Sequence, residues 1–210
     1  MQTVVLCNDA LKAELGNNIS ENEEVIYINN INEILQYQHA DVFIDLLFVN
    51  SPERINILMQ LLPQLVIVNS VADALSEIHP QFIRINGWPT FLQTPVMEAT
   101  CLDNNLKANT EKVFQQLNKT IEWLPDEIGF ITPRVISMII NEAYFALSEG
   151  VSTKQEIDTA MKLGTNHPYG PFEWAEKIGL KKVVALLYKL GDHHSRYKPC
   201  ALLMQEADAT

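Results

Sequence analysis

The stretch DVFIDLLFVNSPERINILMQLLPQLVIVNS, residues 41–70, decides the fold of the first part of this chain. Two short apolar runs, VFIDLL and LVIV, flank a segment whose apolar residues recur at helical spacing. Ser51 is a typical helix N-cap, Pro52 suits the first helical position, and Glu53 lies near the positive end of the helix dipole. Nearly continuous apolar strands joined by a helix are typical of a parallel sheet that is covered on both faces.

The same alternation extends outward from this stretch. Short runs rich in Val, Ile and Phe, bounded by Asn, Asp or Pro, predict strands at residues 4–7, 25–28, 42–47, 65–69, 82–86 and 96–102. Helical spacing predicts helices between and after them, at residues 9–15, 31–37, 52–62, 72–78 and 106–117. A short segment, 120–124, then leads to Pro125. We therefore expect an α/β domain over residues 1–125.

After Pro125 the pattern changes to helices alone. Apolar residues recur at helical spacing up to Gly150, and a cap-like start at Ser152 opens the next helix. The predicted helices cover residues 130–147, 152–164, 171–178, 180–190 and 199–207. This change of pattern predicts a second, all-helical domain over residues 126–210.

Composition and charge exclude several classes of protein. The chain has 26 acidic and 15 basic residues, a net charge of -11, and 47% hydrophobic residues, so it is neither disordered nor fibrous. A nucleic-acid partner needs clustered Lys and Arg, but only Lys181 and Lys182 are adjacent, so we expect no nucleic acid. The longest apolar stretch, 135–147, contains Asn141 and Glu142 and falls short of the roughly 20 apolar residues of a membrane helix. We therefore expect no membrane span.

The first residues and the cysteines predict a cytoplasmic protein. Residues 1–15 lack a basic leader before a long apolar core, unlike a secretory signal. The three cysteines, Cys7, Cys101 and Cys200, are odd in number and widely spaced, which favours reduced thiols over a disulfide framework.

Residues 129–180 carry several motifs that occur together in one known family. These are NEA, EGV, EIDTAMKLG and NHPYGPFEWA, and RYKPCALL follows at residues 196–203. Together they resemble the C-terminal helical domain of the 3-hydroxyacyl-CoA dehydrogenase family. DVFIDLL, LVIVNS and FIRINGWPTFLQTPVMEAT resemble strands of that family's dinucleotide-binding domain. The resemblance implies an incomplete Rossmann-like domain, shortened between the first helix and Val25, before the helical domain.

In that family the first strand runs into a GxGxxG turn, which binds the NAD pyrophosphate at a helix N-terminus because the backbone can approach the phosphates closely. Aligned on VVLC, residues 4–7, the three glycine positions are Asn8, Ala10 and Ala13. Asn8 could adopt the left-handed conformation, but the Cβ of Ala10 and the charge of Asp9 oppose binding. The resemblance thus implies a degenerate loop, and we expect no cofactor where the family binds NAD.

Other cofactor and substrate positions of the family are also changed. The first 125 residues contain only Gly16 and Gly87, so no glycine-rich phosphate loop lies elsewhere in them. The acidic residue that holds the ribose corresponds to residues 29–30, both Asn, and a serine of the family corresponds to residues 71–72, Val and Ala.

The family's catalytic residues are a His that removes the proton of the 3-hydroxyl group, a Glu that orients it, and an Asn that contacts the substrate. Residues 82–98, aligned without gaps, place Asn86 at the His position and Glu98 at the Glu position. The family's Asn falls at Pro133, with Arg134 retained. Asn cannot act as a base near neutral pH, so of the catalytic set only Glu98 remains. A carboxylate on a strand is equally compatible with a structural ion pair or a solvated side chain.

Other polar residues have structural interpretations. His79, seven extended residues or about 23 Å from Asn86, is expected to be a loop residue. His193 and His194 are adjacent, which is unfavourable for binding one ion, so we expect no metal site. Residues 166–171 are expected to form the turn between two helices.

Three functions remain open. The first is an active NAD-dependent 3-hydroxyacyl-CoA dehydrogenase. The second is a degenerate relative that binds an acyl-CoA or other small ligand, and the third is a structural or regulatory subunit. The resemblance and the apolar residues of 130–147 and 183–190 predict a homodimer formed through the helical domain. The altered residues favour the second and third functions.

Overall fold

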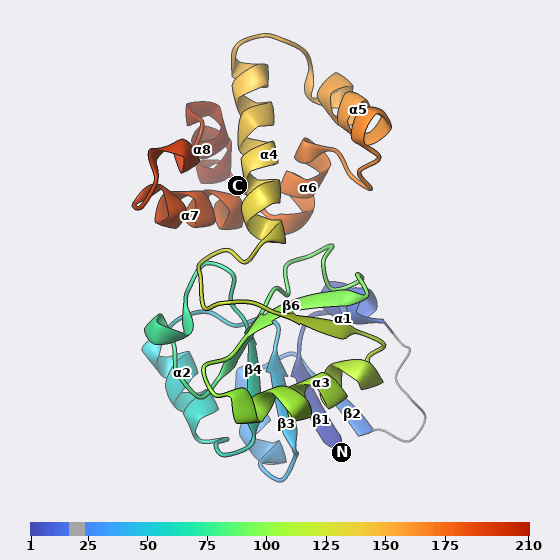
Figure 1. Cartoon of the computed structure of the whole chain (residues 1–210), viewed down its shortest axis with the longest axis vertical. Helices are drawn as coiled ribbons and strands as arrows, with labels where there is room; N and C mark the ends of the chain where they lie inside the picture. The colour runs from blue at the N-terminus through green and yellow to red at the C-terminus, as the bar shows by residue number, and fades with distance from the viewer. Residues whose placement is uncertain (17–23) are drawn as a thin grey trace. The chain divides into compact units, whose positions relative to one another are not determined.

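The computed structural model of the chain describes residues 1–16 and 24–210 (Figure 1). These residues form two compact units, Met1–Phe130 and Ile131–Thr210. We expected the boundary near residue 125, but the following segment belongs to the first unit because its polar groups are bound there. Asp126 forms an ion pair with Arg84, and the Gly129 N–H donates to the Val71 carbonyl at 2.8 Å.

The first unit is built on a seven-stranded sheet in the order β2-β1-β3-β4-β5-β6-β7. Neighbouring strands are parallel, except that β5 and β6 are antiparallel. The strands are β1 (Gln2–Leu6), β2 (Glu24–Ile28), β3 (Val42–Asp45), β4 (Leu65–Asn69), β5 (Ile83–Ile85), β6 (Val96–Thr100) and β7 (Thr120–Trp123). The expected Rossmann-like fold class is confirmed, with one antiparallel pair in the otherwise parallel sheet.

Helices cover both faces of this sheet, as the apolar strands predict. Alternate side chains of a strand point to opposite faces, so Val5 packs with α1 (Asp9–Leu15) and α3 (Lys107–Gln116), which follows η3 (Asn104–Leu106). Val4 packs with η1 (Ile31–Tyr37), α2 (Pro52–Met59) and η2 (Leu75–Glu77) on the other face. Val4 and Val5 are both 0% exposed, so successive residues of a strand are buried on opposite faces of the sheet. This explains why the strands are almost continuously apolar.

Local signals predicted some elements better than others. Ser51 caps α2 as expected, accepting from the Arg54 N–H at 3.2 Å. The α-helix expected at residues 72–78 is wrong: only the single 3₁₀ turn η2 forms, since Pro80 disfavours helical geometry at the preceding residue. The segment 31–37 is likewise a 3₁₀ helix, of which only Ile34 is fully buried. The segment 120–124 contributes β7, which pairs with β6. The predicted shortening before Val25 falls beside residues 17–23, outside the described residues.

The second unit consists of helices joined by loops. Its elements are α4 (Thr132–Ser148), α5 (Lys154–Thr165), α6 (Pro171–Ile178), α7 (Leu180–Gly191), η4 (Ser195–Tyr197) and α8 (Ala201–Asp208). The five predicted helices are confirmed: α6 has the predicted ends, and the ends of the others differ by at most two residues. The long helix α4 is central, because α6, α7 and α8 all pack against it (Figure 1). Among the described residues, no helix is long and apolar enough to cross a membrane.

The motifs of this unit hold its helices together. Asn141, from NEA, is buried and bonds both the Lys198 carbonyl, at 3.0 Å, and the Cys200 N–H, at 2.8 Å. In NHPYGPFEWA, a Cβ at Gly170 would lie 2.2 Å from the Asp158 carboxylate, so only glycine fits there. Asn166 ends α5 in the left-handed conformation, which confirms the turn expected at residues 166–171.

Candidate functional site

Polar side chains occur at or just beyond the carboxyl ends of the first five strands. In open α/β sheets this edge is where ligands bind. The residues are Asn8 after β1, Asn29 after β2, Asp45 in β3, Asn69 in β4 and Asn86 after β5. This edge is therefore the candidate site, and the hydrogen bonds of each side chain indicate what remains available for a ligand.

Asn8 is the N-cap of α1. Its Oδ1 accepts from the Leu11 N–H at 2.9 Å, so the side chain satisfies a helix amide that a phosphate would otherwise bind. Its backbone is extended, with φ of -94°, so the left-handed conformation we considered is wrong. Asp9 follows in the first turn, and Ala10 and Ala13 both lie within the helix. The negative charge of Asp9 at this helix N-terminus disfavours a pyrophosphate, so these residues do not fit NAD.

A small cavity of about 220 Å³ lies between the carboxyl ends of β1 and β2. Its wall includes Asp9, Glu33 and Lys12, and the Lys12 ammonium lies 4.4 Å from the centroid of the Tyr27 ring. Burial raises the pKa of the Tyr27 phenol, and among the described residues its hydroxyl has no hydrogen-bond partner. Sites for small molecules usually span roughly 300–1,000 Å³, so this cavity is small for a dinucleotide.

Asn86 and Glu98 are brought together, as their alignment with a catalytic pair predicts. They lie opposite each other where β5 meets β6, and both are buried. The Asn86 Nδ2 donates to the Glu98 Oε2 at 3.0 Å, and the Asn86 N–H donates to the Glu98 carbonyl at 3.0 Å. The pair therefore keeps a side-chain hydrogen bond to the carboxylate, but the amide supplies no titratable group for proton transfer.

Asn69 is a site residue that the sequence analysis missed. Its Nδ2 donates to the carbonyls of Leu46, at 3.1 Å, and Gly87, at 3.0 Å, while its Oδ1 accepts from the Gly87 N–H at 2.9 Å. Asn69 thus joins the ends of three neighbouring strands. The available signals were a polar residue ending an apolar strand and a lone glycine directly after Asn86.

Two further contacts involve helices of this unit, one made by α2 and one made by α1. Arg54 donates to both carboxylate oxygens of Asp45, at 2.7 and 2.8 Å. The Thr90 N–H, in the loop between β5 and β6, donates to the Glu14 Oε2 of α1 at 2.6 Å. Thr90 has φ of 80°, an uncommon conformation for a β-branched residue. The loop is therefore held against α1 by a specific contact despite local strain.

The remaining family positions lie in different surroundings. Val71 is buried and its carbonyl accepts from Gly129. Pro133 is buried in the first turn of α4, in the second unit. The next residue, Arg134, lines a cavity of about 400 Å³ with Arg196 and Tyr197.

The histidines considered at the sequence level have local partners or stay exposed. His79 lies in the turn before β5, and its Nδ1 accepts from the Gln81 N–H at 3.3 Å. His193 and His194 are exposed at the end of α7. In the described ranges, no three His, Cys, Asp or Glu side chains are grouped so that they could hold a metal ion.

Comparisons with known proteins support the fold over the whole chain. The family described as 3-hydroxyacyl-CoA dehydrogenase, C-terminal domain, matches residues 129–210. The crystal structure of (S)-3-hydroxybutyryl-CoA dehydrogenase PaaH1 from Ralstonia eutropha is 20% identical, with a TM-score of 0.74 over 99% of this chain and 93% of that one. At this identity the likeness concerns the fold alone.

Two curated relatives differ in how much of their length is matched. A probable 3-hydroxybutyryl-CoA dehydrogenase of Bacillus subtilis is 31% identical over 95% of this chain and 76% of its own length. The 3-hydroxyadipyl-CoA dehydrogenase of Escherichia coli is 46% identical over 44% of this chain, but the match spans only 20% of that protein.

The fold is a Rossmann-like α/β unit followed by a helical unit. With the match to the Bacillus relative, the chain belongs to the 3-hydroxyacyl-CoA dehydrogenase family.

Proposed function

We propose that this chain is a member of the 3-hydroxyacyl-CoA dehydrogenase family that has lost NAD-dependent oxidation and acts by binding an acyl-CoA or a related acyl ligand. The observation that carries this proposal is the start of α1, where Asn8 caps the helix and Asp9 adds a negative charge at the position of the family's phosphate-binding turn. The buried pair of Asn86 and Glu98, in which an amide stands at the position of the family's base, supports it further. Family membership supports acyl-CoA metabolism as the setting. The three cysteines are free thiols, in keeping with a cytoplasmic location.

The loss of the cofactor site supports the proposal more strongly than the loss of the base. Removing a general base typically costs a factor of about 10² to 10⁴, which by itself leaves a slow enzyme. Without a nicotinamide there is no hydride acceptor, and no reaction remains to accelerate. Asn8 and Asp9 at the start of α1 therefore matter more than Asn86.

An assay of NADH oxidation with acetoacetyl-CoA tests the proposal. The unmodified chain and Asn86→His are compared by NADH fluorescence, and we expect neither saturable NADH binding nor turnover from either protein. His at position 86 restores the base beside Glu98 but leaves α1 unchanged, so it separates the two losses. Steady turnover by the unmodified chain would contradict the proposal.

The ligand is tested separately by thermal shift with CoA, acetyl-CoA, a long-chain acyl-CoA, NAD and NADP. A ligand that binds only the native state and is present at 100 times its Kd stabilises that state by about 2.7 kcal/mol. We expect a rise in Tm with an acyl-CoA and none with NAD or NADP. A rise with NAD alone would reverse the assignment.

Active oxidation of a 3-hydroxyacyl-CoA is the second candidate. The match to the Bacillus relative favours it, because that protein is described as a probable 3-hydroxybutyryl-CoA dehydrogenase and the match covers 95% of this chain. The same NADH assay distinguishes the two candidates.

We further propose that the chain forms a homodimer through α4. Ile131 and Val135 are 56% and 52% exposed, and they continue into Met138 and Ile139 on the same side of the helix. The expected contribution of residues 183–190 to the interface is wrong, because Val183, Leu186, Leu187 and Leu190 are buried inside the unit. The proposed interface therefore rests on the exposed apolar residues at the start of α4.

A further inference from the structure

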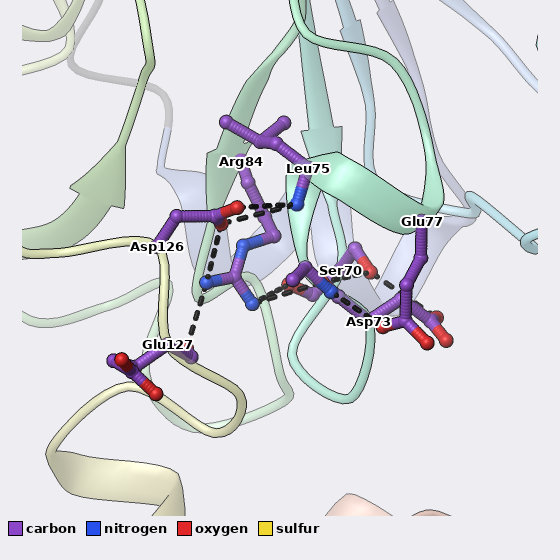
Figure 2. A network of polar contacts seen from close by, with 8 residues as sticks. Ser70, Asp73, Leu75, Glu77, Arg84, Asp126 and Glu127 are labelled. Carbon is purple, nitrogen blue, oxygen red and sulfur yellow. Dashed lines mark hydrogen bonds and ion pairs between the residues drawn. The ribbon is translucent and has the colours of Figure 1, made fainter.

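Arg84 is a fully buried charged residue on β5, between two apolar neighbours of the strand. Its guanidinium bonds two segments that are far apart in the sequence: loop 70–77, which directly follows β4, and segment 126–130, which ends the first unit (Figure 2). A buried guanidinium needs several acceptors to offset its desolvation.

Both segments supply those acceptors. From loop 70–77, the Asp73 carbonyl accepts from Nη1 at 2.9 Å and the Ser70 carbonyl lies at 3.5 Å. From segment 126–130, the Glu127 carbonyl accepts from Nη2 at 2.8 Å and the Asp126 carboxylate lies 3.1 Å from Nη2. Burial lowers the pKa of Arg84, while the carboxylates of Asp126, Asp73 and Glu77 favour its charged form.

The two segments also bind each other directly. Asp126 accepts from the Leu75 N–H at 2.9 and 3.1 Å, although the two residues are 51 positions apart. The Gly129 N–H donates to the Val71 carbonyl at 2.8 Å. Phe130 stacks on the Arg84 guanidinium, whose Cζ lies 4.4 Å from the ring centroid.

The end of segment 126–130 is held in an uncommon conformation. Gly129 and Phe130 have φ values of 88° and 48°, and the left-handed region costs energy for a residue with a side chain. The Arg84 stacking and the Gly129 hydrogen bond compensate for that strain. If either segment leaves, the buried cation loses half of its acceptors, which penalises every partly open state.

We propose that Arg84 makes loop 70–77 and segment 126–130 one cooperative latch, whose two segments open and close together. Because segment 126–130 directly precedes Ile131, the first residue of the second unit, the latch fixes the point at which the chain leaves the first unit. A ligand or partner that orders loop 70–77 then also orders this segment, and the effect is reciprocal.

Hydrogen exchange at single amides tests the coupling. The reporter amides are Leu75, which donates to Asp126, and Gly129, which donates to Val71. In Arg84→Met we expect both amides to exchange at least about tenfold faster, and by a similar factor, because they open in one event.

The matched control is Arg54→Met, which removes another arginine–carboxylate pair of this unit, that of the partly buried Arg54 with the buried Asp45. Its reporter is the Leu47 amide, which donates to the Asp45 Oδ1 at 3.0 Å. We expect this variant to speed exchange at Leu47 and to leave Leu75 and Gly129 unchanged, whereas Arg84→Met leaves Leu47 unchanged.

If Arg84→Met does not fold, Asp126→Asn gives the same test with an isosteric side chain. Gly129 does not bond to Asp126, so a purely local effect changes Leu75 alone. Faster exchange at both amides supports the latch. Acceleration at only one of them, or equal acceleration in Arg54→Met, overturns it.

Discussion

At the residue scale, the polar side chains at the strand ends mostly bind the protein itself. Asn8 caps a helix, Asp45 pairs with Arg54, Asn69 joins three strands and Asn86 bonds Glu98. Each bond removes a donor or acceptor that a ligand would need, and breaking it leaves a polar group unpaired at a cost of about 1–3 kcal/mol. This edge therefore contributes to stability, and its side chains offer few free groups to a dinucleotide.

The close contact between Gly87 and Asn69 gives a first prediction. A Cβ at position 87 would lie 2.8 Å from the Asn69 Cγ, so Gly87→Ala forces this side chain to move and loses its bonds. We expect the free energy of unfolding in urea to fall by about 1–3 kcal/mol.

Gly164→Ala is the control, since nothing lies within 4 Å of a Cβ there and the residue is in a helix. It should be neutral or stabilise the chain by up to about 1 kcal/mol. Equal loss in both variants would count against a specific role of Asn69.

At the element scale, helices of the second unit are joined by side chains that end or begin their neighbours. Asp158 of α5 accepts from the Phe172 N–H at 2.8 Å in the first turn of α6, whose own N-cap, Gly170, has no side chain. Tyr144 of α4 donates to Glu206 of α8 at 2.7 Å, and Lys154 of α5 binds the same carboxylate. These contacts are hydrogen bonds as well as packing contacts, because each one gives a polar group of one helix a partner on another helix.

Asp158 therefore acts as the N-cap of a helix to which it does not belong. We expect Asp158→Ala to lower the free energy of unfolding by about 0.5–2 kcal/mol, as for other N-cap losses, and Asp158→Asn to lower it less because the amide oxygen still accepts. The exposed Asp192, at the end of α7, provides the control variant Asp192→Ala, for which urea unfolding should give no loss.

The Tyr144 contact predicts a pH dependence. Burial and Glu206 raise the pKa of Tyr144 above its ordinary value near 10. Above that pH the unfolded chain loses the phenol proton while the folded chain retains it, so the stability that this tyrosine contributes is lost as pH rises. We expect the stability difference between the unmodified chain and Tyr144→Phe to shrink between about pH 8 and about pH 11 in urea unfolding.

The exposed Tyr188 supplies the control for this measurement. Tyr188→Phe should leave the pH dependence unchanged. A difference that stays constant with pH in Tyr144→Phe would show that the phenol proton is not linked to folding.

At the scale of the whole molecule, the exposed apolar side of α4 raises the question of oligomeric state. We predict a dimer in solution, with a mass near twice 23.8 kDa by light scattering at micromolar concentration. Val135→Glu places a charge on this side and should give monomers without loss of fold, because Val135 is 52% exposed.

Val151→Glu is the matched control, since Val151 is 70% exposed but follows the end of α4. It should stay dimeric. A monomeric mass for the unmodified chain would reject the interface.

The sequence by itself determined the alternation of strands and helices, the change to helices after the sheet, and the altered residues Asn8 and Asn86. These features depend on local periodicity, on capping and on residue identity, all of which can be read over a few neighbouring positions. The positions of Asn86 and Glu98 followed from the resemblance to the family's catalytic His and Glu, whereas the antiparallel register that brings them together came from the structure.

Only the tertiary structure decided the roles of Arg84 and Asn69 and the burial of Leu186 and Leu187. Arg84 is a charge within an apolar strand, and its partner Asp126 becomes visible only when the chain folds back after β7. Likewise, helical spacing indicates an apolar face on α7, but only the structure shows that α4 and α8 pack against this helix. Contacts between distant residues depend on how elements pack, and no local pattern records that packing.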